Sequence, residues 1–375
     1  MSAFDGVLQR SRSYLSRRFG RRVAAESLIV DRLVAEPWFI DLVQVEAAQV
    51  SADGWSFPHS QATSFYLNGT PFDSISHPLL RTDVGEHFWQ RREASMSGFH
   101  CRSSAVAQAY PDGIMRLSRS GDNTRIDSGR DHWYIPDASM QHDLPDADRR
   151  FRVMGNPDVT AFLNTGATDL HRLNDIVQKL LGKPLWDVAR VLDWGVGCGR
   201  LARHFPRQRA GKLDGCDIDH DNVAWCAANL AGNFVPSSLA PPLPFDDDCF
   251  DVVYGVSVFT HLREALQDRW LAELRRITRV GGLVLTTVHG ETAVEFFRLR
   301  PTEYAHLKLA IAKRGLLVSS GNSQLDGHVE QPGEYVNVFH DSNYIGRHWS
   351  AYFDILHVIP GYIFTHDLVV MRRRT

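Results

Sequence analysis

The stretch VLDWGVGCGR at residues 191–200 decides the fold of the larger part of this chain. It is a short apolar run that ends in Asp193 and then places a glycine at every second position, at Gly195, Gly197 and Gly199. Glycine has no Cβ, so it adopts backbone angles that other residues avoid and lets a ligand lie against the main chain. In a doubly wound sheet, ligands bind where a strand turns into its helix. The stretch therefore predicts a ligand-binding turn at the carboxyl end of a parallel strand.

Strands and helices alternate on both sides of this turn. Hydrophobic periodicity and Gly or Pro stops predict strands at 189–194, 212–217, 251–257 and 283–288, and helices at 157–182, 200–208, 221–230 and 264–279. Strands separated by helices of this length form a parallel sheet that is covered on both faces. At the end of the chain, two apolar runs within 352–374, joined by Pro360-Gly361, predict an antiparallel hairpin on the edge of that sheet.

The part of the chain before this region has a different pattern. From about 38 to 140, apolar residues alternate with a period of two between turn-forming segments, which predicts a small antiparallel β-sandwich. The polar, proline-containing segment 140–152 is the best candidate for a linker. We therefore expect a β-sandwich-like domain at 1–145 and a doubly wound α/β domain at 146–375, the latter with an insert at about 291–345.

The β-rich part carries no motif that identifies a ligand. Its aromatic residues fit either a packed core, which their spacing favours, or a platform on which sugars stack. These residues are Trp55, Phe57, Phe65, Tyr66, Phe88, Trp89 and Phe99.

Composition argues against several classes of function. With 375 residues, 43% of them hydrophobic, and a formal net charge of −3, the chain is typical of a two-domain globular protein and lacks a bulk charge for nucleic acid. The five cysteines form no CxxC pair, which argues against a disulfide framework and a structural zinc site. No apolar run reaches the roughly 18 residues of a membrane span. The amino terminus has no apolar signal core, so we expect a cytoplasmic protein.

One local exception is the basic segment 8–23, in which six arginines surround apolar residues. It is either a solvated helix packed on its own domain or an amphipathic helix that makes weak contact with a membrane surface. Nothing in the sequence indicates an oligomeric state.

An acid follows the second predicted strand of the α/β part, as a ribose site requires. Asp217 stands about 20 residues after the glycine turn, where a carboxylate reads ribose hydroxyls. A dinucleotide site has the pattern G-x-G-x-x-G, but the position of its third glycine is Arg200 here. The spacing therefore predicts a ligand with a ribose but without the phosphates of a dinucleotide.

The motifs D-x-G-x-G-x-G at 193–199 and G-x-D at 215–217 resemble those of class I S-adenosylmethionine-dependent methyltransferases. The resemblance continues through LPFDDDCFDVVYGVSVFTHL at 243–262 and WLAELRRITRVGGLVLTTVHG at 270–290. It implies a Rossmann-like, mostly parallel seven-stranded sheet and S-adenosylmethionine as cofactor. It also implies a set of binding residues: Asp193 near the amino group, Gly195, Gly197 and Gly199 beside the methionine part and ribose, Asp217 at the ribose diol, Ser238 and Leu239 at adenine, Val256 and Ser257 facing the sulfonium, and Val196 and Ile218 as further cofactor-binding residues.

Some of these polar residues have a second interpretation. Asp193 and Asp217 could each cap backbone amides and only shape the loop. The run of acids at 246–248 fits a solvated turn better than a metal site, and we expect no metal. Arg172 fits a surface salt bridge better than contact with a ligand carboxylate.

A hydroxyl group that accepts a methyl group needs a base for its proton. Three histidines are candidates: His261 in VFTHL, His340 in NVFHDSNYIGRHW and His289 in TVHGE. An ordinary histidine pKa near 6.5 suits this role at neutral pH. His261 comes first, because it follows the strand whose end the resemblance places beside the reactive methyl group. The insert at 291–345, a predicted helix pair followed by a polar loop, is a candidate lid or acceptor wall.

A looser resemblance connects the whole arrangement to bacterial methyltransferases associated with cell-surface glycan synthesis. It implies O-methylation of a sugar or glycan intermediate, with the β-sandwich as a docking or recognition module. Three alternatives remain open: methylation of another small-molecule hydroxyl or carboxylate, a non-catalytic scaffold with the cofactor fold, and a nicotinamide-dependent oxidoreductase, which Arg200 disfavours.

Overall fold

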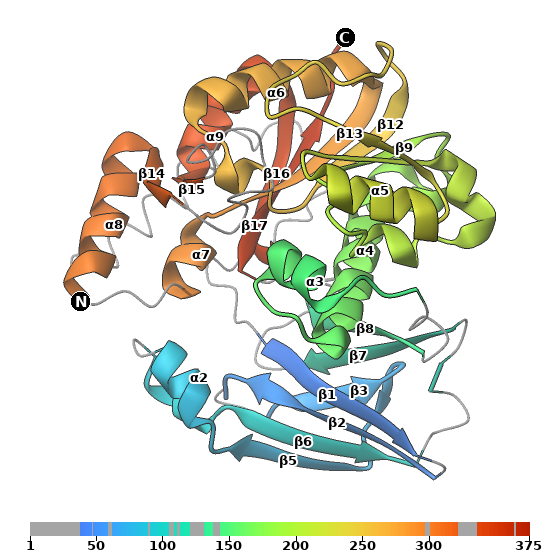
Figure 1. Ribbon diagram of the computed structural model, residues 1–375. Coiled ribbons are helices and arrows are strands. Elements are labelled where there is room, and N and C mark those ends of the chain that lie inside the picture. The colour runs from blue at the N-terminus through green and yellow to red at the C-terminus, as the bar shows by residue number, and fades with distance from the viewer. Residues whose placement is uncertain are drawn as a thin grey trace. The chain divides into compact units, whose positions relative to one another are not determined.

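The fold is known from a computed structural model (Figure 1). It describes residues 38–46, 48–58, 62–88, 91–104, 109–110, 113–120, 131–137, 143–296, 301–321, 336–363 and 365–375. The chain divides into two compact units, 1–33 and 34–375. The basic segment 8–23 lies outside the described residues, so its contact with a membrane surface stays a prediction. Among the described helices, none combines the length and apolarity that crossing a membrane requires.

An N-terminal β-rich domain is present, built from two four-stranded antiparallel sheets. One sheet has the order β1 (Trp38–Glu46), β2 (Gln49–Ser56), β6 (Gly98–Ser103) and β5 (Ser74–Leu79). The other has the order β4 (Thr70–Pro71), β3 (Ser64–Leu67), β7 (Ile114–Ser120) and β8 (His132–Pro136). Short helices α2 (Thr82–His87) and η1 (Arg92–Met96) lie between β5 and β6 in the chain.

Aromatic side chains from both sheets share one core. Trp38 packs on Phe65, Phe99 and Trp133, with ring centroids 6.1, 6.2 and 6.4 Å apart. Of the predicted aromatic set, Trp55, Phe57, Phe65, Phe88 and Phe99 are buried, and Tyr66 is partly buried. Trp89 lies outside the described residues. The described members therefore favour core packing over a sugar-stacking platform.

The predicted doubly wound domain is confirmed as a seven-stranded, mostly parallel sheet. Its order is β11 (Asn233–Pro236), β10 (Leu213–Asp217), β9 (Val191–Trp194), β12 (Phe250–Gly255), β13 (Thr278–Val288), β17 (His366–Arg372) and β16 (Asp354–Ile363). The first five strands are parallel, and β17 and β16 are antiparallel to their neighbours. The chain leaves β9 toward β10 and later returns to its other side with β12. Such a reversal opens a crevice at the carboxyl ends of the strands.

Long helices connect these strands where the sequence predicts them. Helix α4 (Val159–Leu181) begins at Asp158, whose side chain accepts the N–H of Ala161, and ends at Gly182. Helix α5 (His220–Asn229) begins in the same way at Asp219. Helix α6 (Glu264–Ile277) packs its buried residues on the sheet, together with α9 (Ser342–His348) (Figure 1).

The segment 140–152 is not a linker throughout. Residues Ala147–Met154 form helix α3, because the side chain of Asp146 accepts the N–H of Arg149 and Gly155 ends the helix in a left-handed conformation. The predicted domain boundary near 146 stays a prediction.

The predicted helix at 200–208 is wrong. Two short 3₁₀ turns, η7 (Ala202–His204) and η8 (Arg207–Lys212), take its place. Pro206 stands between them, and it has no N–H to donate and disfavours a helical conformation in the residue before it.

The predicted hairpin of β16 and β17 exists, but it does not turn at Pro360-Gly361. Strand β16 continues through this pair to Ile363, with a register shift between Ile359 and Ile363. The N–H of Gly361 donates to the carboxylate of Asp367 at 2.9 Å, so the side chain replaces a strand partner. The irregularity is therefore absorbed within the strand and the chain reverses later.

The insert contains helices α7 (Glu291–Phe296) and α8 (Pro301–Arg314), and a two-stranded sheet of β14 (Leu316–Gly321) and β15 (Val336–His340), which was not predicted. Of the helix pair predicted at 296–315, α8 lies in that stretch, whereas α7 ends where the stretch begins. The N–H of His340 donates to the carbonyl of His289 at 2.8 Å. This bond joins β15 to the carboxyl end of β13. The polar loop at 322–335 lies outside the described residues.

Helix α4 contacts β8 through polar side chains. The hydroxyl of Thr168 accepts the N–H of Tyr134 at 3.0 Å and lies 3.2 Å from the carbonyl of the same residue. Arg172 donates to the carbonyls of His132 and Tyr362 at 3.0 Å. The guanidinium is buried, so the predicted surface salt bridge for Arg172 is wrong: its partners are backbone carbonyls of two different sheets.

We expect Arg172→Met to lower the free energy of unfolding by about 2–4 kcal/mol, because buried carbonyls lose their donors. Urea unfolding followed by tryptophan fluorescence measures the effect. Gln178→Met, at an exposed position of the same helix, is the matched control and should leave the midpoint unchanged. Equal urea midpoints for Arg172→Met and Gln178→Met would contradict the stabilising role of the Arg172 guanidinium.

Candidate functional site

The glycine turn follows β9 at the crevice. Gly195 and Gly199 have φ of 81° and 78°, in the left-handed region that favours glycine. A Cβ on Gly195 would lie 2.4 Å from Cγ2 of Val258, and one on Gly199 would lie 2.3 Å from Cδ1 of Leu230. Both the backbone and the packing therefore require glycine at these positions.

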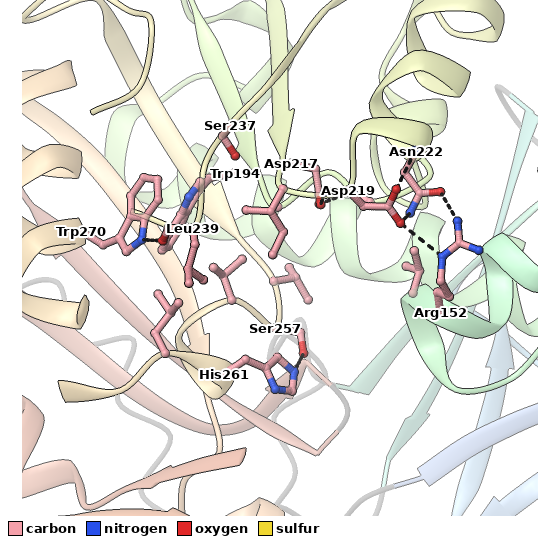
Figure 2. Close-up of a pocket in the computed structure, with 17 residues that line it drawn as sticks. Arg152, Trp194, Asp217, Asp219, Asn222, Ser237, Leu239, Ser257, His261 and Trp270 are labelled. Atoms are coloured by element: carbon pink, nitrogen blue, oxygen red, sulfur yellow. Dashed lines mark hydrogen bonds and ion pairs between the residues drawn. The ribbon is translucent and has the colours of Figure 1, made fainter. Parts of the chain in front are cut away.

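A pocket of about 880 Å³, counting the space open to solvent, lies beside this turn (Figure 2). Of the residues predicted to bind the cofactor or act on it, eight line the pocket: Gly195, Gly197, Asp217, Ile218, Leu239, Val256, Ser257 and His261. Six do not: Asp193, Val196, Gly199, Ser238, His289 and His340.

Asp217 both shapes the turn and faces the pocket. Its Oδ2 accepts the N–H of Gly197 at 2.7 Å, and its Oδ1 accepts the N–H of Asp219 at 2.8 Å. Each carboxylate oxygen has a further lone pair, so both can still accept a ligand hydroxyl. Burial raises the pKa of Asp217 to about 6. The two interpretations of this acid are therefore compatible.

Asp193 is held inside the protein. Its carboxylate is buried and accepts the hydroxyl of Tyr254 at 3.1 Å. Burial raises the pKa of Asp193 to about 7, a change that the bond from Tyr254 opposes. Its role beside a ligand amino group stays a prediction.

Helix α3 supplies two pocket residues that the sequence analysis missed. Arg152 donates to the carboxylate of Asp219 at 3.2 Å, and Val153 lies against Gly197 (Figure 2). The cap at Asp146 and the stop at Gly155 are the sequence signals that could have revealed this helix. Trp194, Asp219, Asn222, Ser237, Val258, Leu262 and Trp270 complete the lining.

The charges of the pocket favour a cation over a phosphate. Arg152 is engaged by Asp219, whereas the contacts of Asp217 are with backbone amides. Ile218, Leu239 and Val256 add apolar surface. The pocket therefore combines an acid that can accept further hydrogen bonds with apolar surface.

His261 presents one nitrogen to the pocket. Its Nδ1 lies 2.9 Å from the carbonyl of Val336, which can only accept, so this nitrogen carries the proton. In the neutral ring, Nε2 is then the unprotonated nitrogen, and it lies 3.5 Å from the hydroxyl of Ser257 (Figure 2). Burial lowers the pKa of His261 to about 4, so the ring is neutral at pH 7.

The other two candidate histidines lie behind the pocket wall. His340 is buried, with Nε2 3.1 Å from Oε1 of Gln267. His289 is buried between rings, with centroids 6.0 Å from His261 and 4.9 Å from His366. The structure therefore brings only His261 of the three to the pocket.

Other predicted features lie away from the pocket. Within the acidic run at 246–248, Asp247 pairs with Arg276 and Asp248 with Arg373, which fits a solvated turn. Within the described residues, no group of His, Cys, Asp and Glu side chains is arranged to hold a metal ion. All five cysteines are free thiols, and four are buried.

Comparisons with known proteins agree with this geometry. Residues 191–282 match a family described as a methyltransferase domain. The ubiquinone/menaquinone biosynthesis C-methyltransferase of Ralstonia pickettii is 36% identical over 105 residues, which are 26% of this chain and 41% of that protein. An uncharacterized protein of Haemophilus influenzae is 28% identical over 103 residues, again 41% of its length. The chain thus spans about two fifths of the curated relatives that it matches.

Solved structures are also similar. Magnesium protoporphyrin IX methyltransferase from Synechocystis, crystallised with S-adenosylhomocysteine, is 16% identical, with 60% of this chain and 93% of that chain covered and a TM-score of 0.38. A protein from Pyrococcus horikoshii gives 16% identity, 60% and 98% coverage and a TM-score of 0.38. The family match, the glycine turn and the acid after β10 agree on one identification. Residues 191–282 therefore have the sequence features of a methyltransferase domain.

Proposed function

We propose that the whole protein transfers a methyl group from S-adenosylmethionine to a hydroxyl group of a sugar or glycan intermediate. The observation that carries the proposal is the pocket that unites the glycine turn and Asp217 with the unprotonated Nε2 of His261. The glycine turn and Asp217 are the features expected of a nucleoside site, and His261 is the neutral base.

The residues present fit the cofactor. Asp217 would hold the ribose diol, Leu239 would border the adenine, and Val256 would face the sulfur. When bound, S-adenosylmethionine supplies a methyl carbon on a positively charged sulfur. The glycines and the apolar side chains exclude water and keep the reacting groups aligned, as an in-line displacement requires.

His261 would take the proton of the acceptor hydroxyl on Nε2, since Nδ1–H already donates to Val336. The same carbonyl would stabilise the imidazolium that forms. Because the ring is neutral at pH 7, no proton has to leave it before the reaction. General-base catalysis of this kind contributes about 10²- to 10⁴-fold to a rate.

Two observations support a hydroxyl over a carboxylate as acceptor. A carboxylate acceptor has no proton to lose, so it needs no base. His261 is nevertheless oriented as a base, because the bond from Nδ1 to Val336 leaves Nε2 unprotonated. A carboxylate also calls for a cation, and Arg152, the one arginine among the described residues that line the pocket, already pairs with Asp219. The choice of a sugar rests on the looser resemblance to glycan-associated methyltransferases and on the additional β-rich domain.

The test offers the full chain methyl-labelled S-adenosylmethionine together with nucleotide sugars, lipid-linked glycans, phenols and small acids. We expect label in the sugar-containing acceptors. Label in phenols or acids alone would contradict the glycan acceptor and leave methyl transfer standing. Failure of the folded protein to bind the cofactor or to label any acceptor would instead favour the scaffold alternative.

We expect affinity for S-adenosylmethionine to rise with pH. A carboxyl with a pKa of about 6 is roughly one-quarter ionised at pH 5.5, so Asp217 alone gives about a fourfold gain by pH 8. Calorimetric titration at both pH values measures it, and a flat or falling affinity would contradict the role of Asp217. The stability of the ligand-free protein should change in the opposite sense. The folded state keeps a proton that the unfolded state releases near pH 4, so unfolding becomes easier as pH rises from about 4 to 6.

A further inference from the structure

Ser257 has an unusual backbone conformation at the pocket wall. It follows β12, lines the pocket and has φ of 63°, in the left-handed region that residues other than glycine rarely adopt. Such conformations carry strain and persist where the surroundings hold them. The groups that hold Ser257 therefore bear on the geometry of the site.

Thr287 of β13 supplies the first of these groups. Its Oγ1 accepts the N–H of Ser257 at 2.7 Å, and the side chain is fully buried. The hydroxyl has one proton of its own to donate. Nδ1 of His366, the first residue of β17, lies 3.3 Å away.

The Ser257 N–H donates to Thr287 Oγ1, whereas the direction of the bond between Thr287 and His366 depends on the tautomer of the ring. We assign the tautomer with the proton on Nε2 of His366, in which Thr287 donates to Nδ1. Burial lowers the pKa of His366 to about 3, which keeps the ring neutral at pH 7. The ring is fixed on its other side by His289.

We propose that Thr287 and His366 are positioning residues for the reaction: they hold Ser257 so that its hydroxyl stands beside Nε2 of His261, where both can contact the acceptor hydroxyl. The inference rests on the proposed function. The three residues come from β13, from the end of β12 and from β17, and β17 belongs to the C-terminal hairpin. The Ser257 hydroxyl also lies 3.2 Å from the hydroxyl of Thr260, which steadies it.

The test compares Thr287→Val with Thr287→Ser. Valine has nearly the same shape but no hydroxyl, so Ser257 loses the acceptor for its N–H, whereas serine keeps it. With the best acceptor from the labelled panel, we expect kcat of Thr287→Val to fall about 10- to 100-fold, as a displacement of about 1 Å in a reacting group can cause. Thr287→Ser should retain most of the activity. Affinity for S-adenosylmethionine should change by less than about threefold in both variants, because Asp217 and the glycine turn dominate it.

A second readout does not depend on turnover. Long-range ¹H–¹⁵N NMR spectra of the histidine rings report which nitrogen carries the proton. We expect His366 of the wild type to be protonated on Nε2, and the ring signals of His366 and His261 to move in Thr287→Val but not in Thr287→Ser.

Unchanged kcat and unchanged ring signals in Thr287→Val would overturn the inference, as would equal losses in Thr287→Val and Thr287→Ser. If Thr287→Val does not unfold cooperatively, His366→Leu decides, because it removes only the outer partner: a lower kcat at unchanged cofactor affinity supports the inference, and wild-type kcat overturns it. A wild type that binds no S-adenosylmethionine would refute the proposed function, and the ring spectra would still test the hydrogen bonds by themselves.

Discussion

Asp217→Ala should weaken the binding of S-adenosylmethionine by about 100-fold or more. A carboxylate that accepts both hydroxyls of a ribose contributes about 1.5–3 kcal/mol through each hydrogen bond, and each 1.4 kcal/mol is a factor of ten. Calorimetric titration of the purified chain measures the loss directly.

Two controls separate this effect from damage to the fold. Asp221→Ala removes an exposed acid four residues farther along and should leave the affinity unchanged. Because Asp217 also holds the amides of Gly197 and Asp219, thermal unfolding of the variant must be cooperative for the result to count. Binding within about threefold of the wild type in a folded Asp217→Ala protein would mean that the ribose lies elsewhere.

His261→Gln should lower the turnover of a hydroxyl acceptor by about 10²- to 10⁴-fold, which is the usual contribution of a general base. Affinity for the cofactor should stay within about threefold, since glutamine preserves the volume of the wall. Single-turnover transfer of labelled methyl groups separates the chemical step from product release.

His340→Gln is the matched comparison. His340 bonds Gln267 behind the pocket wall, so its replacement should affect stability more than turnover. Equal loss of turnover in the two variants would return His340 to the list of candidate bases and count against His261.

The glycine turn and its acid were predictable because each has a local cause. The positive φ angles at Gly195 and Gly199 admit few other residues, and Asp217 ends a strand whose neighbours also end there. The same holds for α4, whose capping Asp158 and terminal Gly182 stand in the sequence as clear boundaries.

Features that depend on distant partners were not predictable. Nothing local shows that Asp193 faces Tyr254, 61 residues away, or that Nδ1 of His261 meets a carbonyl 75 residues away. The order of preference among the three histidines came from position along the chain. Only the fold shows that His289 and His340 do not line the pocket. His289 is buried against the ring of Phe339, and His340 is buried with Gln267 as hydrogen-bond partner.

Two of the wrong predictions concern prolines, and each has its own physical cause. Pro206 was included in a helix on the strength of apolar spacing, and Pro360 was made a turn on the strength of the following glycine. In the first case the missing N–H decides against the helix. In the second, the carboxylate of Asp367 offers the backbone an alternative partner, so a strand continues where local composition predicts a reversal.

The contact between Thr168 and Tyr134 has a consequence for solubility. Strand β8 is the last strand of its sheet, and an open edge of this kind is a template on which another chain can add a strand. A threonine hydroxyl, which meets both the N–H and the carbonyl of Tyr134, occupies the position of that missing strand. At the opposite edge, β4 is only two residues long and ends in Pro71, which has no N–H to offer. Helix α4 therefore covers the edge that β8 would otherwise leave open, and Thr168→Val would remove the side chain that bonds the backbone of Tyr134 there.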